Sequence, residues 1–177
     1  SKGATVDYVD VKYLDNAVTL YQIIAMGEAS SNLARFDGIR YGHSKENPKD
    51  IESLYLETRA EGFGEEVKRR IMVGSYLLSG ENAKIYYDKA LSIRDDMKKE
   101  FSKVFENYDL IIGPTTTTTA YDLTESMDDP RKTFMDDVLV IPVNMAGLPG
   151  LNIPVGFDKE NMPIGMHIIG NAFEKAK

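Results

Sequence analysis

Residues 135–157 read MDDVLVIPVNMAGLPGLNIPVGF, and residues 163–170 read PIGMHIIG. The first stretch joins two neighbouring acids, Asp136 and Asp137, to a bend rich in glycine and proline that runs into apolar residues. We expect short strands at about 151–156 and 164–169, joined as a hairpin by the polar residues between them. Gly147 sits in the bend, where glycine allows a positive φ. This arrangement places polar groups at the end of a sheet, where α/β enzymes commonly bind ligands.

Upstream of this stretch the apolar residues recur mainly at helical spacing. The pattern predicts four helices. The first spans 17–33, the second begins after an N-cap at Asp50, the third spans 65–78, and the fourth, at about 82–108, is the longest and most clearly amphipathic. Two further strands are expected, a weak one at 5–11 and a buried one at 109–112. Residues 115–119 are five threonines that could extend this last strand or form a loop. Residues 121–133 read as a surface loop.

The composition is that of a folded protein and excludes several kinds of site. The 177 residues, 42% of them hydrophobic, can bury the core of one domain, so we expect a single unit over residues 1–177. The net charge of −7 does not favour a main role in binding nucleic acid.

The residue types that are absent or rare exclude further kinds of site. Cysteine is absent and only two histidines occur, His43 and His167, so a thiolate nucleophile is excluded and a multi-histidine metal site is not expected. No apolar run is long enough to predict a membrane span, and we expect a cytoplasmic protein.

A second stretch connects the chain to a known family. Residues 28–42 read EASSNLARFDGIRYG. Together with residues 135–170, this segment resembles the C-terminal half of amidase-signature enzymes, and the likeness extends from about residue 5 to residue 173. Within the family it is most similar to the A subunits of aspartyl/glutamyl-tRNA amidotransferases. The resemblance implies an α/β fold: part of an amidase-signature domain, with a mixed sheet flanked by helices and with strands missing that the N-terminal half would supply.

The resemblance also implies a substrate site for glutamine, formed by Tyr21, Arg70 and Asp137. Free glutamine carries an ammonium and a carboxylate, and a planar guanidinium such as that of Arg70 suits the carboxylate. An aspartate suits the ammonium. The match rests on GFGEEVKRRI at 62–71 for Arg70 and on the acid pair for Asp137, with Asp136 as its rival. Tyr21 is matched by its place before residues 28–32.

Catalytic residues are not expected in this chain. Members of the family act through a Ser–cis-Ser–Lys triad in a Gly/Ser-rich signature of the N-terminal half, and no such run occurs here. We therefore expect the chain alone to be inactive and the pair Ser30–Ser31 to hydrogen-bond locally at a helix end. Two other interpretations stay open, a fragment of a stand-alone amidase acting on another small amide and a non-catalytic docking module.

The resemblance implies a larger assembly as well. The A subunits of the amidotransferases hydrolyse glutamine and supply ammonia for the transamidation of misacylated tRNA, in a heterotrimer with B and C subunits. The B subunit would use ATP and magnesium and would hold most of the tRNA. No cofactor is expected in this chain itself.

Overall fold

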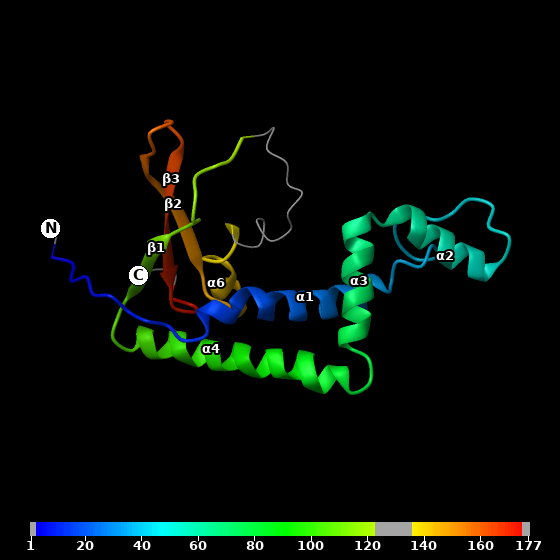
Figure 1. Cartoon of the computed structure of the whole chain (residues 1–177), viewed down its shortest axis with the longest axis horizontal. Helices are drawn as coiled ribbons and strands as arrows, with labels where there is room; N and C mark the ends of the chain where they lie inside the picture. The colour runs from blue at the N-terminus through cyan, green and yellow to red at the C-terminus, as the bar shows by residue number, and fades with distance from the viewer. Residues whose placement is uncertain (1–2, 123–135, 175–177) are drawn as a thin grey trace. The chain divides into compact units, whose positions relative to one another are not determined.

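The computed structural model describes residues 3–122 and 136–174. Its contacts divide the chain into two compact units, one formed by residues 1–21 and 92–177 and the other by residues 22–91 (Figure 1). The expectation that residues 1–177 form a single domain stays a prediction. The elements of the described residues are a 3-10 turn at Leu14–Asn16, α1 (Ala17–Leu33), α2 (Ile51–Gly62), α3 (Glu65–Leu77), a π-helical turn at Ala83–Asp88, α4 (Lys89–Phe105), β1 (Leu110–Pro114), α6 (Ile141–Ala146), β2 (Gly150–Phe157) and β3 (Pro163–Gly170).

Two helices of the 22–91 unit begin where the sequence signals predict. Asp50 caps α2, since its Oδ1 accepts a hydrogen bond from the backbone N–H of Ser53 at 2.7 Å. Gly64 precedes α3, whose first turn carries Glu65 and Glu66, and carboxylates at that end interact favourably with the helix dipole.

Within this unit α1 and α3 approach each other closely. A Cβ on Gly74 would overlap the carbonyl oxygen of Met26 and would lie 2.7 Å from the Cβ of Ser30. Only a residue without a side chain fits at this crossing. Position 74 of α3 is therefore fixed as glycine by packing, although its helical backbone does not require one.

The loop before α2 is tied to that helix by Arg59 and Thr58. The guanidinium of Arg59 donates to the carbonyl oxygens of Leu33 and Phe36 at 3.0 and 3.1 Å and lies 5.0 Å from the ring centre of Phe63. The buried hydroxyl of Thr58 accepts a hydrogen bond from the backbone N–H of Lys45. The two bonds from Arg59 thus pair the last carbonyl of α1, that of Leu33, and a carbonyl just beyond the helix, that of Phe36.

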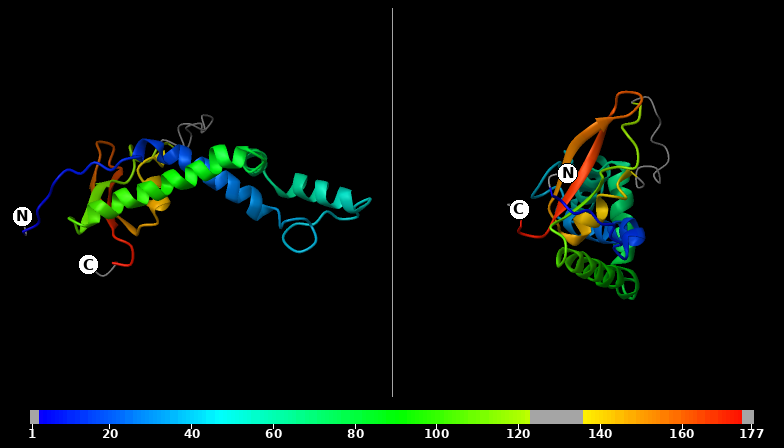
Figure 2. Two further views of the ribbon diagram at one scale, coloured as in Figure 1. Left: turned by 90° about the horizontal axis from the view of Figure 1, so that it is seen from below. Right: turned by 90° about the vertical axis from the view of Figure 1, so that its left-hand side faces the viewer.

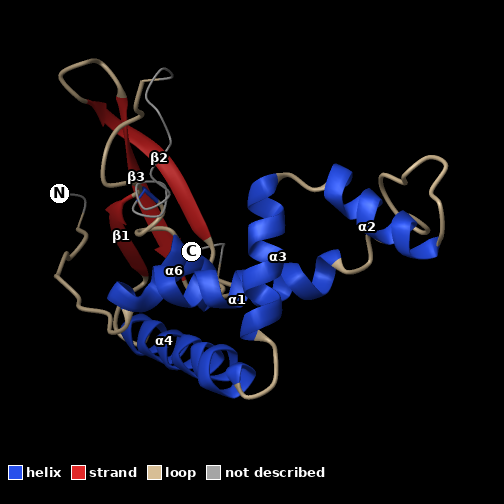
Figure 3. Ribbon diagram, turned by 45° about the vertical axis from the view of Figure 1, so that its right-hand side comes forward, coloured by secondary structure: helices blue, strands red, loops and turns tan. Residues whose placement is uncertain are grey.

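The other unit contains a three-stranded sheet in the order β1-β3-β2 (Figure 3). Both strand pairs are antiparallel, with Ile111 opposite Ile169 and Leu151 opposite Ile168. β2 and β3 form the predicted hairpin, which twists along its length (Figure 2) and carries a bulge between Pro154 and Gly156.

The two faces of this sheet differ sharply. Ile169 is 8% exposed, and the buried residues of the same unit include Met97, Phe101, Ile141 and Val143 from α4 and α6. Successive side chains of a strand point to opposite faces, so the Ile168 row lies on the other face. Leu110, Ile112 and Leu151 on that second face are 47%, 54% and 59% exposed. The core therefore covers one face of the sheet, while apolar side chains remain exposed on the other.

Three expectations about the elements need correction. Residues 5–11 form no strand, because they pair with no neighbouring strand in the described residues. The helix expected over 82–108 is interrupted at its start by a π-helical turn and ends at Phe105. The sheet of the described residues is wholly antiparallel, whereas a mixed sheet was expected; a mixed sheet would need further strands. Residues 123–133 of the expected surface loop lie outside the described residues.

Candidate functional site

Arg70 lies in the second turn of α3, where its side chain is 43% exposed. Its guanidinium Nε donates to the Oε1 of Glu66, one turn earlier, at 2.8 Å. The side chain is accessible to solvent and is held at one nitrogen by its own helix. A guanidinium in this state retains donors that can bind a carboxylate from solution.

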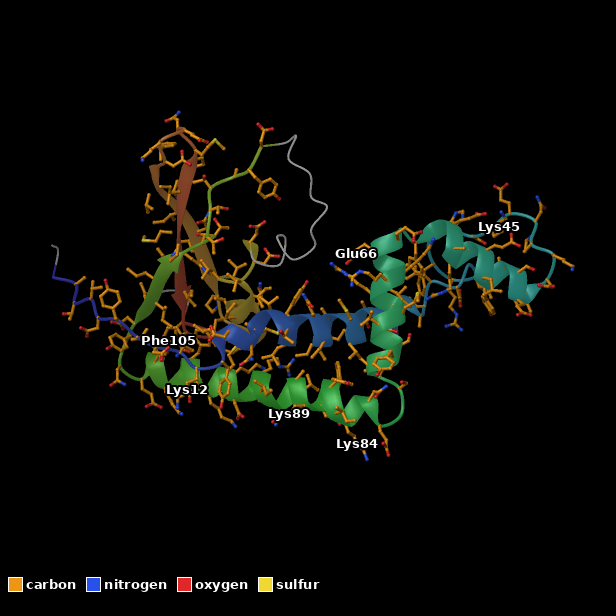
Figure 4. All side chains as sticks on the ribbon, in the orientation of Figure 1. Lys12, Lys45, Glu66, Lys84, Lys89 and Phe105 are labelled. Atoms are coloured by element: carbon orange, nitrogen blue, oxygen red, sulfur yellow. The ribbon has the colours of Figure 1, made fainter. Side chains whose placement is uncertain are left out.

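Glu66, whose position on α3 is labelled in Figure 4, also binds a second arginine. Arg69 donates its Nε to Oε2 at 2.7 Å and its Nη2 to Oε1 at 2.6 Å, which is a bidentate pair. The hydrogen bonds from Arg69, and after them those from Arg70, lower the pKa of Glu66 to about 2. Glu66 also raises the pKa of Arg69. Sequence reasoning missed this cluster, although the spacings of three and four residues on one helix could have signalled it.

Asp137 lies in the turn that leads into α6. Its main-chain carbonyl accepts hydrogen bonds from the N–H groups of Val140 and Ile141 at 3.0 and 2.9 Å. Asp137 is exposed, while its rival Asp136 is half-buried. The turn thus fixes the backbone of Asp137 and leaves this residue accessible to a ligand.

The bend after α6 has the geometry that the sequence predicts. Gly147 adopts φ 73° as the C-cap of α6, and its N–H bonds to the carbonyl of Asn144 at 3.1 Å. A helix at Ile141–Ala146 was not expected from the sequence. Its residues Ile141, Pro142 and Val143 are buried, so tertiary packing stabilises a helix too short to form alone.

Tyr21 lies in α1 and is half-buried. Tyr21 and Asp137 belong to the unit that contains the sheet, and Arg70 belongs to the 22–91 unit. Their convergence on one substrate therefore stays a prediction.

Ser30 has a different partner from the local one that was expected. Its hydroxyl lies 2.9 Å from the hydroxyl of Ser75 on α3, 45 residues away. Ser75 donates its hydrogen to the carbonyl of Ile71 at 2.8 Å, so Ser30 is the donor between the two hydroxyls. The pair fixes α1 against α3, and this structural role accounts for Ser30.

The five-threonine run contributes hydrogen bonds at the edge of the sheet. Its first residue continues the β1–β3 ladder, since the N–H of Thr115 donates to the carbonyl of Gly165, and its hydroxyl donates to the side-chain oxygen of Asn152 at 2.5 Å. The last residue, Thr119, donates to Asp158 in the β2–β3 turn. These threonines are thus engaged in structural bonds.

Metal and membrane sites are not found in the part of the chain that the structure describes. No group of three or more histidine, aspartate or glutamate side chains there is arranged to hold a metal ion. None of the described helices combines the length and apolar character that crossing a membrane requires.

Comparison with known proteins shows to which family the chain belongs. The family model described as "Amidase" matches residues 1–177. The chain belongs to the amidase family. It is 49% identical over 173 residues to the A subunit of the glutamyl-tRNA(Gln) amidotransferase of Pediococcus pentosaceus, and 48% identical over 174 residues to that of Bacillus cytotoxicus. Each alignment covers 98% of this chain, and 35% or 36% of the relative.

Solved amidase structures support the same fold. The A subunit of the glutamyl-tRNA(Gln) amidotransferase of Thermotoga maritima matches with a TM-score of 0.66 and 34% identity, over 97% of this chain and 32% of that one. A second structure, that of an amidase, matches with a TM-score of 0.68 at 21% identity, which shows the fold alone. The chain thus spans about a third of the length of the amidase-family proteins that it matches.

Proposed function

We propose that this chain is the C-terminal part of the A subunit of an aspartyl/glutamyl-tRNA amidotransferase and that it forms the glutamine-binding wall of that enzyme. The observation that carries the proposal is the identity of about half of all residues with named A subunits over nearly the whole chain. The parent enzyme hydrolyses glutamine to glutamate and ammonia, and the ammonia is used to transamidate misacylated Glu-tRNA(Gln) or Asp-tRNA(Asn).

In this proposal Arg70 binds the α-carboxylate of glutamine and Asp137 binds its α-ammonium, with Tyr21 lining the pocket. Arg70 and Asp137 are both accessible to a ligand, and each lies at a fixed point of the backbone, in α3 or in the turn before α6. Charges of opposite sign at two points of a pocket orient a zwitterion. Holding the substrate in one orientation favours attack on its side-chain amide.

The bond-breaking residues lie in the remaining two thirds of the parent protein in this proposal. The chain alone is then inactive, because the Ser–cis-Ser–Lys triad is elsewhere. The same missing part supplies strands that complete the sheet. The exposed row of Leu110, Ile112 and Leu151 supports this, since apolar surface of that kind is stabilised when another layer covers it.

The partners follow from the same assignment. The parent enzyme forms a cytoplasmic heterotrimer with amidotransferase B and C subunits. The B subunit holds ATP, magnesium and most of the misacylated tRNA. The net charge of −7 on this chain agrees with leaving the polyphosphate ligand to a partner.

The test is steady-state glutaminase kinetics of the full-length protein in its heterotrimer. Asp137→Asn and Arg70→Ala are each expected to raise the KM for glutamine about tenfold or more, because a hydrogen bond to a charged group contributes roughly 1.5–3 kcal/mol. Asp136→Asn and Lys68→Ala are the matched controls, each a neighbouring charge of the same sign. An unchanged KM in Asp137→Asn or Arg70→Ala contradicts the assignment, and an effect of Asp136→Asn alone moves the ammonium site to that residue.

A panel of amides separates the proposal from its alternatives. The proposed enzyme releases ammonia from glutamine in preference to simple aliphatic or aromatic amides. Faster release from another small amide identifies a stand-alone amidase. Binding to the B and C subunits without any effect of Arg70→Ala and Asp137→Asn identifies a docking module.

A further inference from the structure

Arg69 and Arg70 share one carboxylate, that of Glu66, but they use it differently. Arg69 offers Nε and Nη2 together and occupies both oxygens, at 2.7 and 2.6 Å. Arg70 offers only Nε, at 2.8 Å to Oε1. Glu66 therefore forms a closed bidentate pair with Arg69 and a single bond with Arg70.

The single bond leaves the terminal nitrogens of Arg70 available. A guanidinium has five N–H donors, and four of them lie on its two Nη atoms. No other hydrogen bond or ion pair of Arg70 is found among the residues that the structure describes. The Nη1–Nη2 edge is one of the edges that bind a carboxylate through two parallel hydrogen bonds.

We propose that Glu66 is a positioning residue, which holds the guanidinium of Arg70 by its Nε so that the two terminal nitrogens face the α-carboxylate of glutamine. This inference rests on the proposed function. A free arginine side chain loses rotamer freedom when it binds a ligand, and one already held at Nε loses less. Glu66 would thereby improve substrate binding without contacting the substrate.

Arg69 has a part in this arrangement. Because it occupies both oxygens of Glu66, it keeps the carboxylate from turning to form a bidentate pair with Arg70 and so from competing with the substrate. The same bonds lower the pKa of Glu66, in agreement with a carboxylate that is held by both arginines. The three side chains form a fixed cluster on the first two turns of α3, whose backbone positions them.

Glu66→Gln in the full-length enzyme, assembled with the B and C subunits, tests the proposal. The KM for glutamine should rise about three- to tenfold with kcat nearly unchanged, as expected when a preorganising contact is lost. Glu65→Gln is the matched control: it removes the same charge from the same helical turn, where Glu65 pairs only with Lys68 at 3.1 Å in the described residues. Glu65→Gln should leave KM unchanged.

A double mutant shows whether Glu66 acts through Arg70. In an Arg70→Ala background, Glu66→Gln should add little to the KM, since the group that it positions is gone. An unchanged or lowered KM in Glu66→Gln overturns the proposal, and so does a full additional effect in the double mutant. If Arg70→Ala itself leaves KM unchanged, the proposed glutamine site fails; if only Glu66→Gln is silent, the positioning role alone fails.

Discussion

Gly74 of α3 packs directly against the backbone carbonyl of Met26 of α1. The two helices approach so closely at this point that even a methyl group would overlap the oxygen atom. The hydroxyl pair of Ser30 and Ser75 lies next to it and is satisfied within the same crossing. The 22–91 unit therefore depends on a small residue at position 74.

Gly74→Ala should destabilise the protein in spite of the better helix propensity of alanine. Alanine in an unconstrained helix would gain about 1 kcal/mol, but overlap with a backbone atom forces α1 and α3 apart and costs roughly 1–3 kcal/mol. Urea unfolding followed by circular dichroism measures the difference. Gly62→Ala is the control, since a Cβ there meets His43 at an ordinary 3.5 Å. A Gly74→Ala variant as stable as Gly62→Ala would show that this crossing does not form.

The two faces of the sheet should respond in opposite ways to a charge. Ile169→Lys buries an ammonium at a site that is 8% exposed and should unfold the sheet-containing unit. Ile112→Lys, at a site 54% exposed, should change stability by less than about 0.5 kcal/mol in this chain. In the full-length protein, Ile112→Lys should reduce the yield of folded enzyme if another layer covers that face. Thermal unfolding of both lengths measures these effects, and a harmless Ile112→Lys in the full-length protein would contradict the covering layer.

The Glu66 cluster should contribute stability that depends on acid pH. The pKa of Glu66 falls from 4.5 to about 2 on folding, so its contribution is fully present above pH 4.5 and is lost as the pH falls through 2. Because the side chain is 53% exposed, solvent screening limits the contribution to less than about 1 kcal/mol. Carboxyl NMR titration of the wild type should place the Glu66 midpoint well below that of an ordinary glutamate. A midpoint near 4.5 would show that the arginines do not hold it.

His167 should make the protein less stable below pH 6.5. Burial lowers its pKa from 6.5, because the protonated ring loses hydration, so the unfolded chain binds a proton more readily than the folded one. A Cβ at position 150 would lie 2.5 Å from the ring nitrogen Nε2 of His167. The imidazole ring therefore fits here only because residue 150 is glycine. The unfolding temperature should fall as the pH drops below 6.5, and His167→Gln should reduce that fall. An NMR midpoint for His167 at or above 6.5 would contradict the lowered pKa.

Much of the local structure could be predicted from the sequence. The periodicity of residues 17–33 predicted α1 with its observed ends, Asp50 predicted the cap of α2, and the polar residues between two apolar runs predicted the β2–β3 hairpin. These features depend on residues close together in the chain. The helix at Ile141–Ala146 was missed for the converse reason: six residues are too few to form a helix alone, and its stability comes from the burial of Ile141, Pro142 and Val143.

The candidate site could be predicted less completely. Family likeness pointed to Tyr21, Arg70 and Asp137, and the structure adds Glu66 as the partner of Arg70. The charge spacing on α3 indicates that Glu66 can pair with Arg69 and Arg70. It does not indicate which of the two arginines binds both oxygens of the Glu66 carboxylate. That choice depends on side-chain geometry, which charge spacing does not specify.

The sequence by itself determined the amidase family, the positions of most helices and the existence of the β2–β3 hairpin, because each follows from residues or patterns that are contiguous in the chain. Only the tertiary structure decided that β3 lies between β1 and β2, that Ser30 bonds to Ser75 and that one face of the sheet stays exposed. The β1–β3 pairing and the Ser30–Ser75 bond join residues that are far apart in the chain. Their pairing is selected by which surfaces fit together after the local elements have formed, and no short-range pattern encodes that fit.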